Sequence, residues 1–261
     1  HELFQLALVH GPVEIIEEVL AVTGIGQNEK ARRFEYSVKL DFYKKIDEMK
    51  APNIAALHGR IEVLNYLATH DFDLSQRYDG MGLFHCAALG GHVAVLDWAK
   101  AQGHDPKYYR IGMTSAPQFA AMAGHIDCLR WFKENDVPFD RKDDGRMPAA
   151  VWAARNGHSE VLKWLRNECG VKLSSLKPQA FRYKNVVHYL AKNGDLETFK
   201  WVKALPWLER PKIDGAKDLE SRSVMMYACK SGNLELVQWL QKECGLKVSR
   251  TKRDQYGTTL G

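Results

Sequence analysis

The chain has 261 residues, of which 45% are hydrophobic and 26% are charged, the composition of an ordinary folded protein. No apolar run approaches the roughly 20 residues needed to span a bilayer, and the net charge of +5 is far below that of a nucleic-acid-binding tail. Length and composition therefore exclude a membrane span and a polybasic tail, and they leave one or two domains open.

The N-terminal 52 residues predict a cap. Residues 1–20 contain a weak helix pair around Gly11, and the absence of an initiator Met leads us to expect an excerpt of a longer protein. Residues 28–50 predict an amphipathic helix, ended by Pro52, because apolar side chains recur on one helical face at Phe34, Val38, Phe42, Ile46 and Met49. We expect this extra helix to cover the exposed end of a helical stack.

From residue 53 onward the chain repeats itself. Seven residues after each of six glycines comes an aromatic residue, and five of the seven tryptophans occupy that position. The intervals between successive glycines are 32, 33, 33, 37 and 38 residues, a period that predicts stacked structural units. The glycines are Gly59, Gly91, Gly124, Gly157, Gly194 and Gly232, and the aromatic residues are Tyr66, Trp98, Trp131, Trp164, Trp201 and Trp239.

Each unit predicts two short helices that flank the glycine. The segment after it carries one apolar stripe, as in NGHSEVLKWL at 156–165. The segment before it carries two small residues, such as Ala87–Ala88, which would let neighbouring helices approach closely. Some thirteen residues after the anchor, a second glycine predicts a left-handed helix C-cap, at Gly24, Gly170 and Gly245.

These units resemble ankyrin repeats. DGMGLFHCAALGGHVAVLDWA at 79–99 follows the family pattern most closely, whereas residues 111–132 place Gln118 at the usual histidine position and the later units have longer connections. The resemblance implies an all-α solenoid of helix-turn-helix units. We expect a cap at 1–52, six repeats at 53–250 and, at 251–261, the start of a further repeat or a C-terminal stub.

The repeated side chains favour structure over chemistry. His92, His125 and His158 sit at equivalent positions of successive units, about 8–10 Å apart, too far to share one metal ion. We expect each to lie near the start of a second helix and to help satisfy its backbone groups. The tryptophan column lies on the stripe that faces neighbouring units, and we expect it to pack there rather than form an exposed strip.

No catalytic constellation competes with this interpretation. His85 and Cys86 are adjacent and point about 100° apart on a helix, so they cannot form a nucleophile–base pair. The usual phosphate-loop, metalloprotease and hydrolase motifs are absent. The five dispersed cysteines favour reduced thiols in an intracellular, cytoplasmic setting. We expect no enzymatic activity within these residues, no cofactor, no metal and no small-molecule substrate.

The connections between units carry the candidate binding residues. The family resemblance implies that these connections, called here the fingers, line one edge of a concave face. Tyrosine and arginine are common among residues that contribute binding energy. A solvated, soluble edge remains the alternative for any one of them. The candidates are Arg77, Tyr78, Tyr108, Tyr109, Arg110, Arg141, Lys142, Arg182, Tyr183, Lys184, Trp207 and Arg210.

The function we expect is non-catalytic recognition of a protein or peptide by a monomer. Two alternatives stay open. The array could be the target-recognition region of a larger enzyme or pathogen effector acting in a host cytoplasm, with its catalytic domain outside this chain. The basic fingers could instead bind nucleic acid or acidic lipid, which we consider less favoured. A near-zero dependence of binding on salt would count against this alternative, because phosphate contacts release counterions.

Overall fold

The computed structural model describes residues 2–16, 18, 51–70, 72–75, 81–107, 110–111, 114–139, 147–175, 184–213, 216–218 and 221–248. The chain divides into two compact units, His1–Phe139 and Asp140–Gly261, called here the N-terminal and C-terminal units. The expected helix at 28–50, the C-cap at Gly24 and the segment 251–261 lie outside the described residues.

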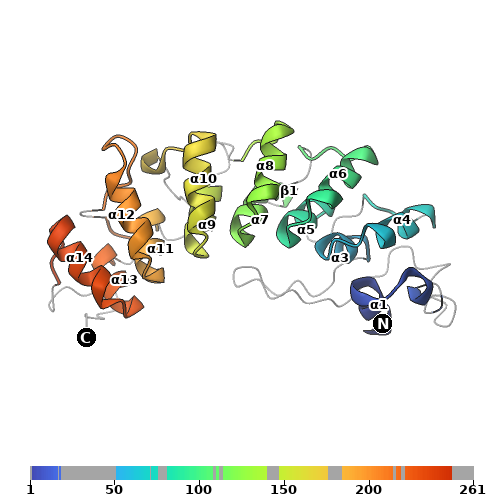
Figure 1. Cartoon of the computed structure of the whole chain (residues 1–261), viewed down its shortest axis with the longest axis horizontal. Helices are drawn as coiled ribbons and strands as arrows, with labels where there is room; N and C mark the ends of the chain where they lie inside the picture. The colour runs from blue at the N-terminus through green and yellow to red at the C-terminus, as the bar shows by residue number, and fades with distance from the viewer. Residues whose placement is uncertain are drawn as a thin grey trace. The chain divides into compact units, whose positions relative to one another are not determined.

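The N-terminal unit is built mainly from helices, and the two helices of each described pair are joined by a short turn (Figure 1). One antiparallel hairpin interrupts them, in which Arg110 pairs with Ser115 and Ile111 with Thr114. The all-α prediction is confirmed, with this two-residue-strand finger as an addition. The elements are α1 (Glu2–His10), α3 (Ala51–Leu57), α4 (Ile61–Thr69), α5 (Leu83–Gly90), α6 (Val93–Ala101), β1 (Arg110–Ile111), β2 (Thr114–Ser115), α7 (Ala116–Ala123) and α8 (Ile126–Glu134).

The C-terminal unit continues the same pattern of paired helices. A single bridge between Lys217 and Ser223 marks a second finger, directly before the last described helix pair. The elements are α9 (Ala149–Arg155), α10 (Ser159–Cys169), the 3-10 turn η1 (Leu173–Ser175), α11 (Val186–Asn193), α12 (Leu196–Ala204), α13 (Val224–Ser231) and α14 (Leu234–Cys244). None of the helices in the described part of the chain is long and apolar enough to cross a membrane.

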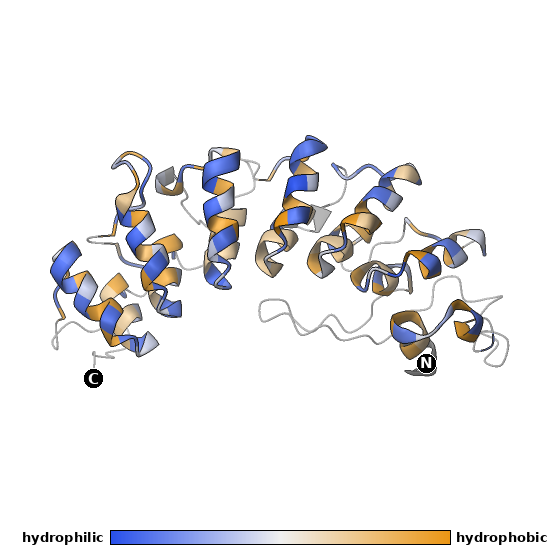
Figure 2. Ribbon diagram, in the orientation of Figure 1, coloured by the Kyte–Doolittle hydropathy of each residue, from blue (hydrophilic) through white to orange (hydrophobic). Residues whose placement is uncertain are grey.

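The first helices of successive repeats form the centre of each unit. In the N-terminal unit α5 packs against α3 and α7, and in the C-terminal unit α11 packs against α9 and α13. The paired small residues make this possible, since Ala87 and Ala88 are fully buried. Second helices such as α8 and α10 show hydrophilic residues toward the viewer in Figure 2, as expected for helices that bury one stripe.

The repeated Gly-His pairs join one repeat to the next. Gly59 and Gly91 adopt left-handed backbone angles, with φ of 72° and 82°. A Cβ atom placed on either would come within 2.6 Å of the imidazole of the following repeat, His92 or His125. Glycine is therefore required twice over, for the backbone angle and for the ring that lies against it.

The histidines occupy the N-cap positions expected of them, but the role expected for their side chains is wrong. His92, His125 and His158 make no side-chain cap hydrogen bond to their own helices. The Nε2 atom of His125 instead lies 3.1 Å from the carbonyl oxygen of Leu89, in the preceding repeat. The side chain does not turn toward its own helix, because the ring extends back over the glycine turn of the preceding repeat. There it bonds to a carbonyl at the end of α5 that has no partner within that helix.

The later repeats replace this histidine with residues that do cap. The Asp195 carboxylate accepts a hydrogen bond from the amide of Thr198 at 2.9 Å, and the Asn233 side chain accepts one from Leu236 at 3.0 Å. Asn233 also donates to the carbonyl of Gly194 at 2.8 Å. One short polar side chain thus caps its helix and bonds to the preceding repeat.

In three of the first helices, α5, α7 and α11, the third residue closes a capping box. The amides of Gly82 and Asn185 lie 3.3 Å from the Nδ1 atoms of His85 and His188, which accept their hydrogen bonds. Gln118 makes the same bond in its repeat, with its Oε1 atom 2.8 Å from the amide of Ser115. The glutamine at the histidine position therefore preserves the turn.

The tryptophan column packs between repeats. Trp131 is buried, and Trp98, Trp164, Trp201 and Trp239 are partly buried. Their indole N–H groups can also bond across the interface, as Trp98 does to Asn65 at 2.7 Å and Trp131 to Asp97 at 2.6 Å. An exposed binding strip is excluded for these five residues.

The ends of the second helices follow the sequence signals. Gly170 and Gly245 take left-handed angles, with φ of 66° and 65°, and cap α10 and α14. The amides of Val171 and Leu246 then bond back to the carbonyls of Leu165 and Leu240 at 3.2 Å, which ties the residue after each glycine to the last turn of its helix. All five cysteine thiols are free.

Candidate interaction surface

The structure describes four of the twelve predicted binding residues, and three of these with their side chains. Arg110 lies on β1, and only its backbone is described. Lys184, Trp207 and Arg210 all belong to the C-terminal unit. The remaining eight lie outside the described residues, namely Arg77, Tyr78, Tyr108, Tyr109, Arg141, Lys142, Arg182 and Tyr183.

Trp207 stands on a tight turn that follows α12, and this turn from 205 to 211 is called here the Trp207 turn. The carbonyl of Pro206 accepts hydrogen bonds from the amides of Glu209 at 2.9 Å and Arg210 at 3.1 Å. Leu205 and Pro211, at the two ends of the turn, are buried. Two prolines fix backbone angles in this short segment, so the turn is held in one conformation.

Residues of the preceding repeat also contact the Trp207 turn. The amide of Ser174, in η1, donates to the carbonyl of Glu209 at 2.9 Å, and its hydroxyl donates to the carbonyl of Leu208 at 2.7 Å. An ion pair joins Arg166 of α10 to Glu209 at 2.5 Å. Two hydrogen bonds to the backbone of the turn and one side-chain ion pair therefore anchor it to a neighbouring repeat.

The side chains at the tip of this fixed turn are exposed. Trp207 is 75% exposed and Leu208 is 64% exposed. The other six tryptophans, all within the described part of the chain, are buried or partly buried. These two adjacent side chains form an exposed apolar patch on an anchored turn, which makes the turn a candidate for binding a partner.

A pocket of about 400 Å³ opens beside Trp207. The turn and the two residues that follow it supply one wall, and α12 and α14 supply the rest. Its lining residues are Lys203, Trp207, Arg210, Pro211, Lys212, Ile213, Glu243 and Cys244. Apolar groups and charged groups of both signs thus meet at one concave place, the usual composition of a binding pocket.

The charges of the pocket do not balance. The ammonium group of Lys203 lies 3.3 Å from the Glu243 carboxylate and 5.5 Å from the centre of the Trp239 ring. Arg210 donates from Nη1 to the carbonyl of Lys203 at 3.2 Å. Neither Arg210 nor Lys212 forms an ion pair with any described residue. The pocket therefore keeps two cations without a carboxylate partner.

The thiol in the pocket is not activated. Burial raises the pKa of Cys244 above its ordinary value, which outweighs the opposing effect of Lys203 and Arg210. The protonated thiol is a poor nucleophile. The geometry therefore supports binding at this pocket and gives no support to covalent catalysis.

Lys184 belongs to a different group of contacts, at the finger before α13. Its ammonium group lies 4.9 Å from the centre of the Tyr227 ring, and the guanidinium of Arg222 lies 5.3 Å from the same centre. Tyr227 donates from its hydroxyl to the buried Asp218 carboxylate at 2.6 Å. The predicted binding residue is thus engaged in packing the finger.

Asp218 is the centre of that network. Its carboxylate also accepts from Arg222, from the backbone amide at 2.9 Å and from Nε at 3.0 Å. Burial alone would raise the pKa of Asp218, but the Tyr227 and Arg222 hydrogen bonds lower it below its ordinary value. An ionised, fully partnered carboxylate holds the finger to α13 and has no spare capacity for a ligand.

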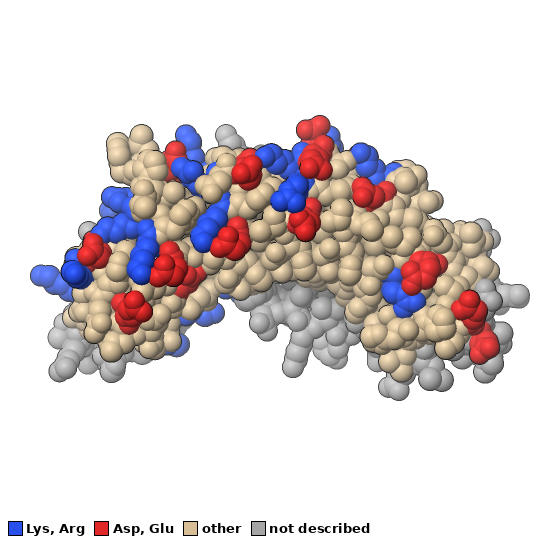
Figure 3. Space-filling model, viewed as in Figure 1, with Lys and Arg blue, Asp and Glu red and all other residues tan. Residues whose placement is uncertain are grey.

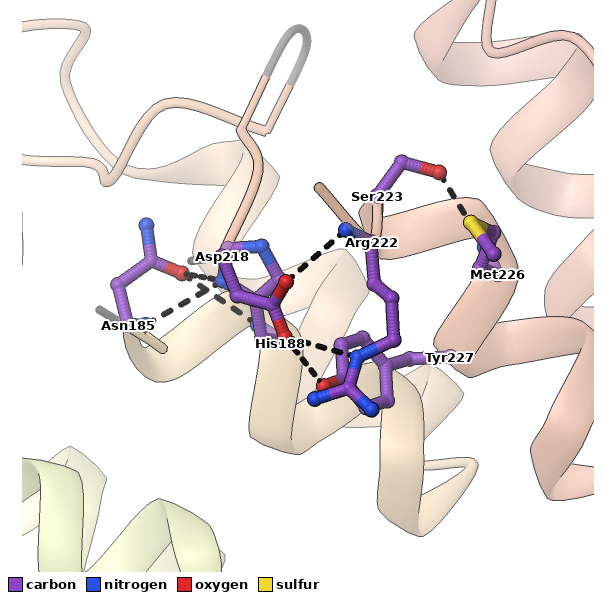
Figure 4. A network of polar contacts seen from close by, with 7 residues as sticks. All are labelled: Asn185, His188, Asp218, Arg222, Ser223, Met226 and Tyr227. Carbon is purple, nitrogen blue, oxygen red and sulfur yellow. Dashed lines mark hydrogen bonds and ion pairs between the residues drawn. The ribbon is translucent and has the colours of Figure 1, made fainter. Parts of the chain in front are cut away.

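His188 of α11 lies beside this network and is almost fully buried (Figure 4). Burial lowers the pKa of His188 to about 4, although the nearby Asp218 carboxylate and the Ala216 carbonyl act in the opposite direction. The ring is therefore neutral near pH 7 and accepts the Asn185 amide bond as a structural cap. No group of three or more metal-ligating side chains occurs among the residues described.

Six of the eight residues that line the Trp207 pocket, and the exposed Leu208 on the turn beside it, are missing from the predicted binding residues. Leu208 has a local signal, because PWLERPK places an apolar pair between two prolines. Lys203 and Glu243 have none, since they are 40 residues apart and only the stacking of α12 and α14 brings them together.

Paired helices stacked through glycine turns, with short fingers between them, define a helical repeat protein of the solenoid type. Sequence patterns described as "Ankyrin repeats (many copies)" match residues 54–99 and 118–166, and one described as "Ankyrin repeat" matches residues 220–250. The chain belongs to the ankyrin repeat family.

One solved structure illustrates the likeness in fold. The structure of the Bd0816 predatory endopeptidase from Bdellovibrio bacteriovorus in complex with immunity protein Bd3460 contains a chain that matches with a TM-score of 0.58 and 17% sequence identity. The match covers 75% of this chain and 98% of the other. A search of curated proteins gave no match.

Proposed function

We propose that this protein is a non-catalytic binding module that recognises a protein or peptide partner through the Trp207 turn and the adjoining pocket. The observation that carries the proposal is the exposure of Trp207 and Leu208 on an anchored turn. Tryptophan is the residue most enriched among those that contribute binding energy, and a fixed backbone reduces the entropy lost on binding.

The rest of the molecule is consistent with binding rather than catalysis. The ionisable groups with the largest environmental effects serve packing, as Asp218, Tyr227 and His188 do at the second finger. Ankyrin repeats are protein-interaction modules, and the structure with a similar fold is a complex of two proteins, an endopeptidase and an immunity protein. We further propose that the chain acts as a monomer in the cytoplasm.

The fingers form the second part of the proposed surface. Arg77, Tyr78, Tyr108, Tyr109, Arg110, Arg141, Lys142, Arg182, Tyr183 and Lys184 remain proposed contacts, because connections between repeats are the segments most free to vary for recognition. The Trp207 turn is the stronger candidate, since its exposure is seen directly.

The test is a selection of peptide binders from a random display library against the full chain. We expect Trp207→Ala to weaken the selected binders at least tenfold, without change in the unfolding midpoint, because the indole is 75% exposed. The triple variant Tyr108→Ala, Tyr109→Ala, Arg110→Ala tests the fingers in parallel. Binders that tolerate Trp207→Ala and are lost with the triple variant would place the site on the fingers and refute the Trp207 turn.

A further inference from the structure

The Trp207 pocket shows which kind of partner it fits. Three cations line it, Lys203, Arg210 and Lys212, against the single carboxylate of Glu243. Lys203 and Glu243 are paired with each other at 3.3 Å. The positive charge that remains, on Arg210 and Lys212, lies in the same pocket as the exposed indole and forms no ion pair with any described residue.

The apolar part of the pocket indicates that the partner also contributes an apolar side chain. Trp207, Pro211 and Ile213 line it together with the cations, and Leu208 extends the apolar surface on the outside of the turn. A volume of about 400 Å³ lies at the lower end of the range for sites that enclose a small molecule. It suits an apolar side chain and the neighbouring atoms of an extended peptide, and is too small to take up a whole helix.

The charge pattern argues against a continuous polyanion. Glu243 lies in the pocket wall, and Figure 3 shows Asp and Glu side chains interleaved with Lys and Arg over α10, α12 and α14. A nucleic acid or an acidic membrane would bring dense negative charge against those carboxylates. A peptide with a few separated carboxylates can pair with Arg210 and Lys212 and avoid Glu243.

We propose that the Trp207 pocket binds an extended acidic segment of a partner protein, in which an apolar side chain packs on Trp207 and flanking carboxylates pair with Arg210 and Lys212. The inference rests on the proposed function and specifies the chemistry of its partner. Arginine matches a carboxylate with two parallel N–H donors, so we assign it the principal contact. Lys212 supplies a second charge that favours association with acidic ligands.

The test uses fluorescein-labelled peptides selected by display on the full chain, each resynthesised with Asp and Glu replaced by Asn and Gln. We expect acidic residues beside a Leu, Phe or Trp in the selected sequences. Neutralising them should weaken binding to the unaltered protein at least tenfold, as measured by fluorescence anisotropy. Neutralisation should have no further effect on a variant that carries Arg210→Glu and Lys212→Glu.

A matched control separates local from general charge. Lys230→Glu with Lys247→Glu alters two exposed lysines outside the pocket by the same total charge and should leave affinity within about twofold. If Arg210→Glu with Lys212→Glu lowers the unfolding midpoint, the pair Arg210→Gln with Lys212→Gln replaces it.

The outcomes distinguish the two proposals. Peptides that depend on Trp207 but bind equally well after neutralisation would overturn the acidic-partner inference and leave the proposed function standing. A selection that yields no Trp207-dependent peptide would overturn both. Equal weakening by the control pair would show that binding follows net charge, which also overturns the inference.

Discussion

His188 shows how one residue can serve a turn and also make the fold sensitive to acid. Its imidazole is almost completely buried in α11, and its Nδ1 atom accepts the bond that closes the capping box at Asn185. Protonation would place a buried charge on the ring, and this burial is the main cause of the lowered pKa of His188. Folding therefore favours the neutral form.

Acid should weaken the C-terminal unit through this group. The pKa of His188 is about 4 in the folded chain and 6.5 when unfolded. Its contribution to stability is therefore fully present above pH 6.5 and is lost as the pH falls from 6.5 toward 4. The shift corresponds to about 3 kcal/mol in the free energy of unfolding. Urea unfolding between pH 7 and pH 4 measures it.

Gln118 suggests the matched control for this prediction. It makes the same capping bond in its own repeat and does not titrate. The variant His188→Gln should therefore fold and should lose much less stability than the parent protein between pH 6.5 and pH 4. An identical pH profile for the two proteins would show that His188 is not the responsible group.

At the scale of the element, the repeat is defined by the contact between a glycine turn and the histidine of the next unit. Gly91 needs a left-handed backbone angle, and His125 lies where its Cβ would be. Sequence spacing predicts the anchor glycines, the helix pairs and the C-caps, because each depends on residues close together in the chain. The bonding partner of the His125 imidazole cannot be predicted from local spacing, because that partner is the carbonyl of Leu89, 36 residues earlier.

Two glycine-to-alanine variants separate the cost of the left-handed backbone angle from the cost of overlap with the histidine ring. Gly91 and Gly103 have nearly equal φ angles of 82° and 84°, but a Cβ at Gly103 meets nothing within 4 Å. Gly103→Ala should cost about 1–2 kcal/mol for the backbone alone. Gly91→Ala should cost about 1–3 kcal/mol more, because the methyl group overlaps the His125 ring. Chemical unfolding compares the two.

The double variant Gly91→Ala, His125→Ala provides the check. Removing the ring should make the added methyl group less costly, so the combined loss should be smaller than the sum of the two single losses. Strict additivity would mean that the glycine and the imidazole do not act together.

At the scale of the whole molecule, a repeat stack transmits disturbance mainly to its neighbours. The cysteines report on this, because Cys86 and Cys128 are buried in the N-terminal unit and Cys229 lies in α13. Burial raises the pKa of Cys128 to about 12 and also raises that of Cys86. Both thiols should therefore react only after local opening.

Gly91→Ala should accordingly change thiol labelling unevenly. The rates at Cys86 and Cys128 should rise at least tenfold, and the rate at Cys229 should rise much less. Mass spectrometry of peptides labelled with a maleimide measures each site separately. A uniform rise at all three cysteines would show instead that the chain opens as one cooperative unit.

The binding surface was harder to predict than the fold for a physical reason. The sequence identifies Trp207 and Arg210 because they lie in a long connection that interrupts the repeat and contains two prolines. It does not reveal that Ser174 and Arg166 anchor the turn, nor that Lys203 and Glu243 form the pocket wall. Those contacts depend on how long connections fold against helices of other repeats, and no local periodicity encodes them.

Hydrogen exchange of the full chain, with and without a selected peptide, tests the central claim most directly. We expect slower exchange on binding in residues 205–213 and at the C-terminal end of α14, around Glu243 and Cys244, with no such change in Trp207→Ala at the same peptide concentration. Slower exchange confined to other segments, with residues 205–213 unaffected, would contradict the assignment of the Trp207 turn as the binding surface.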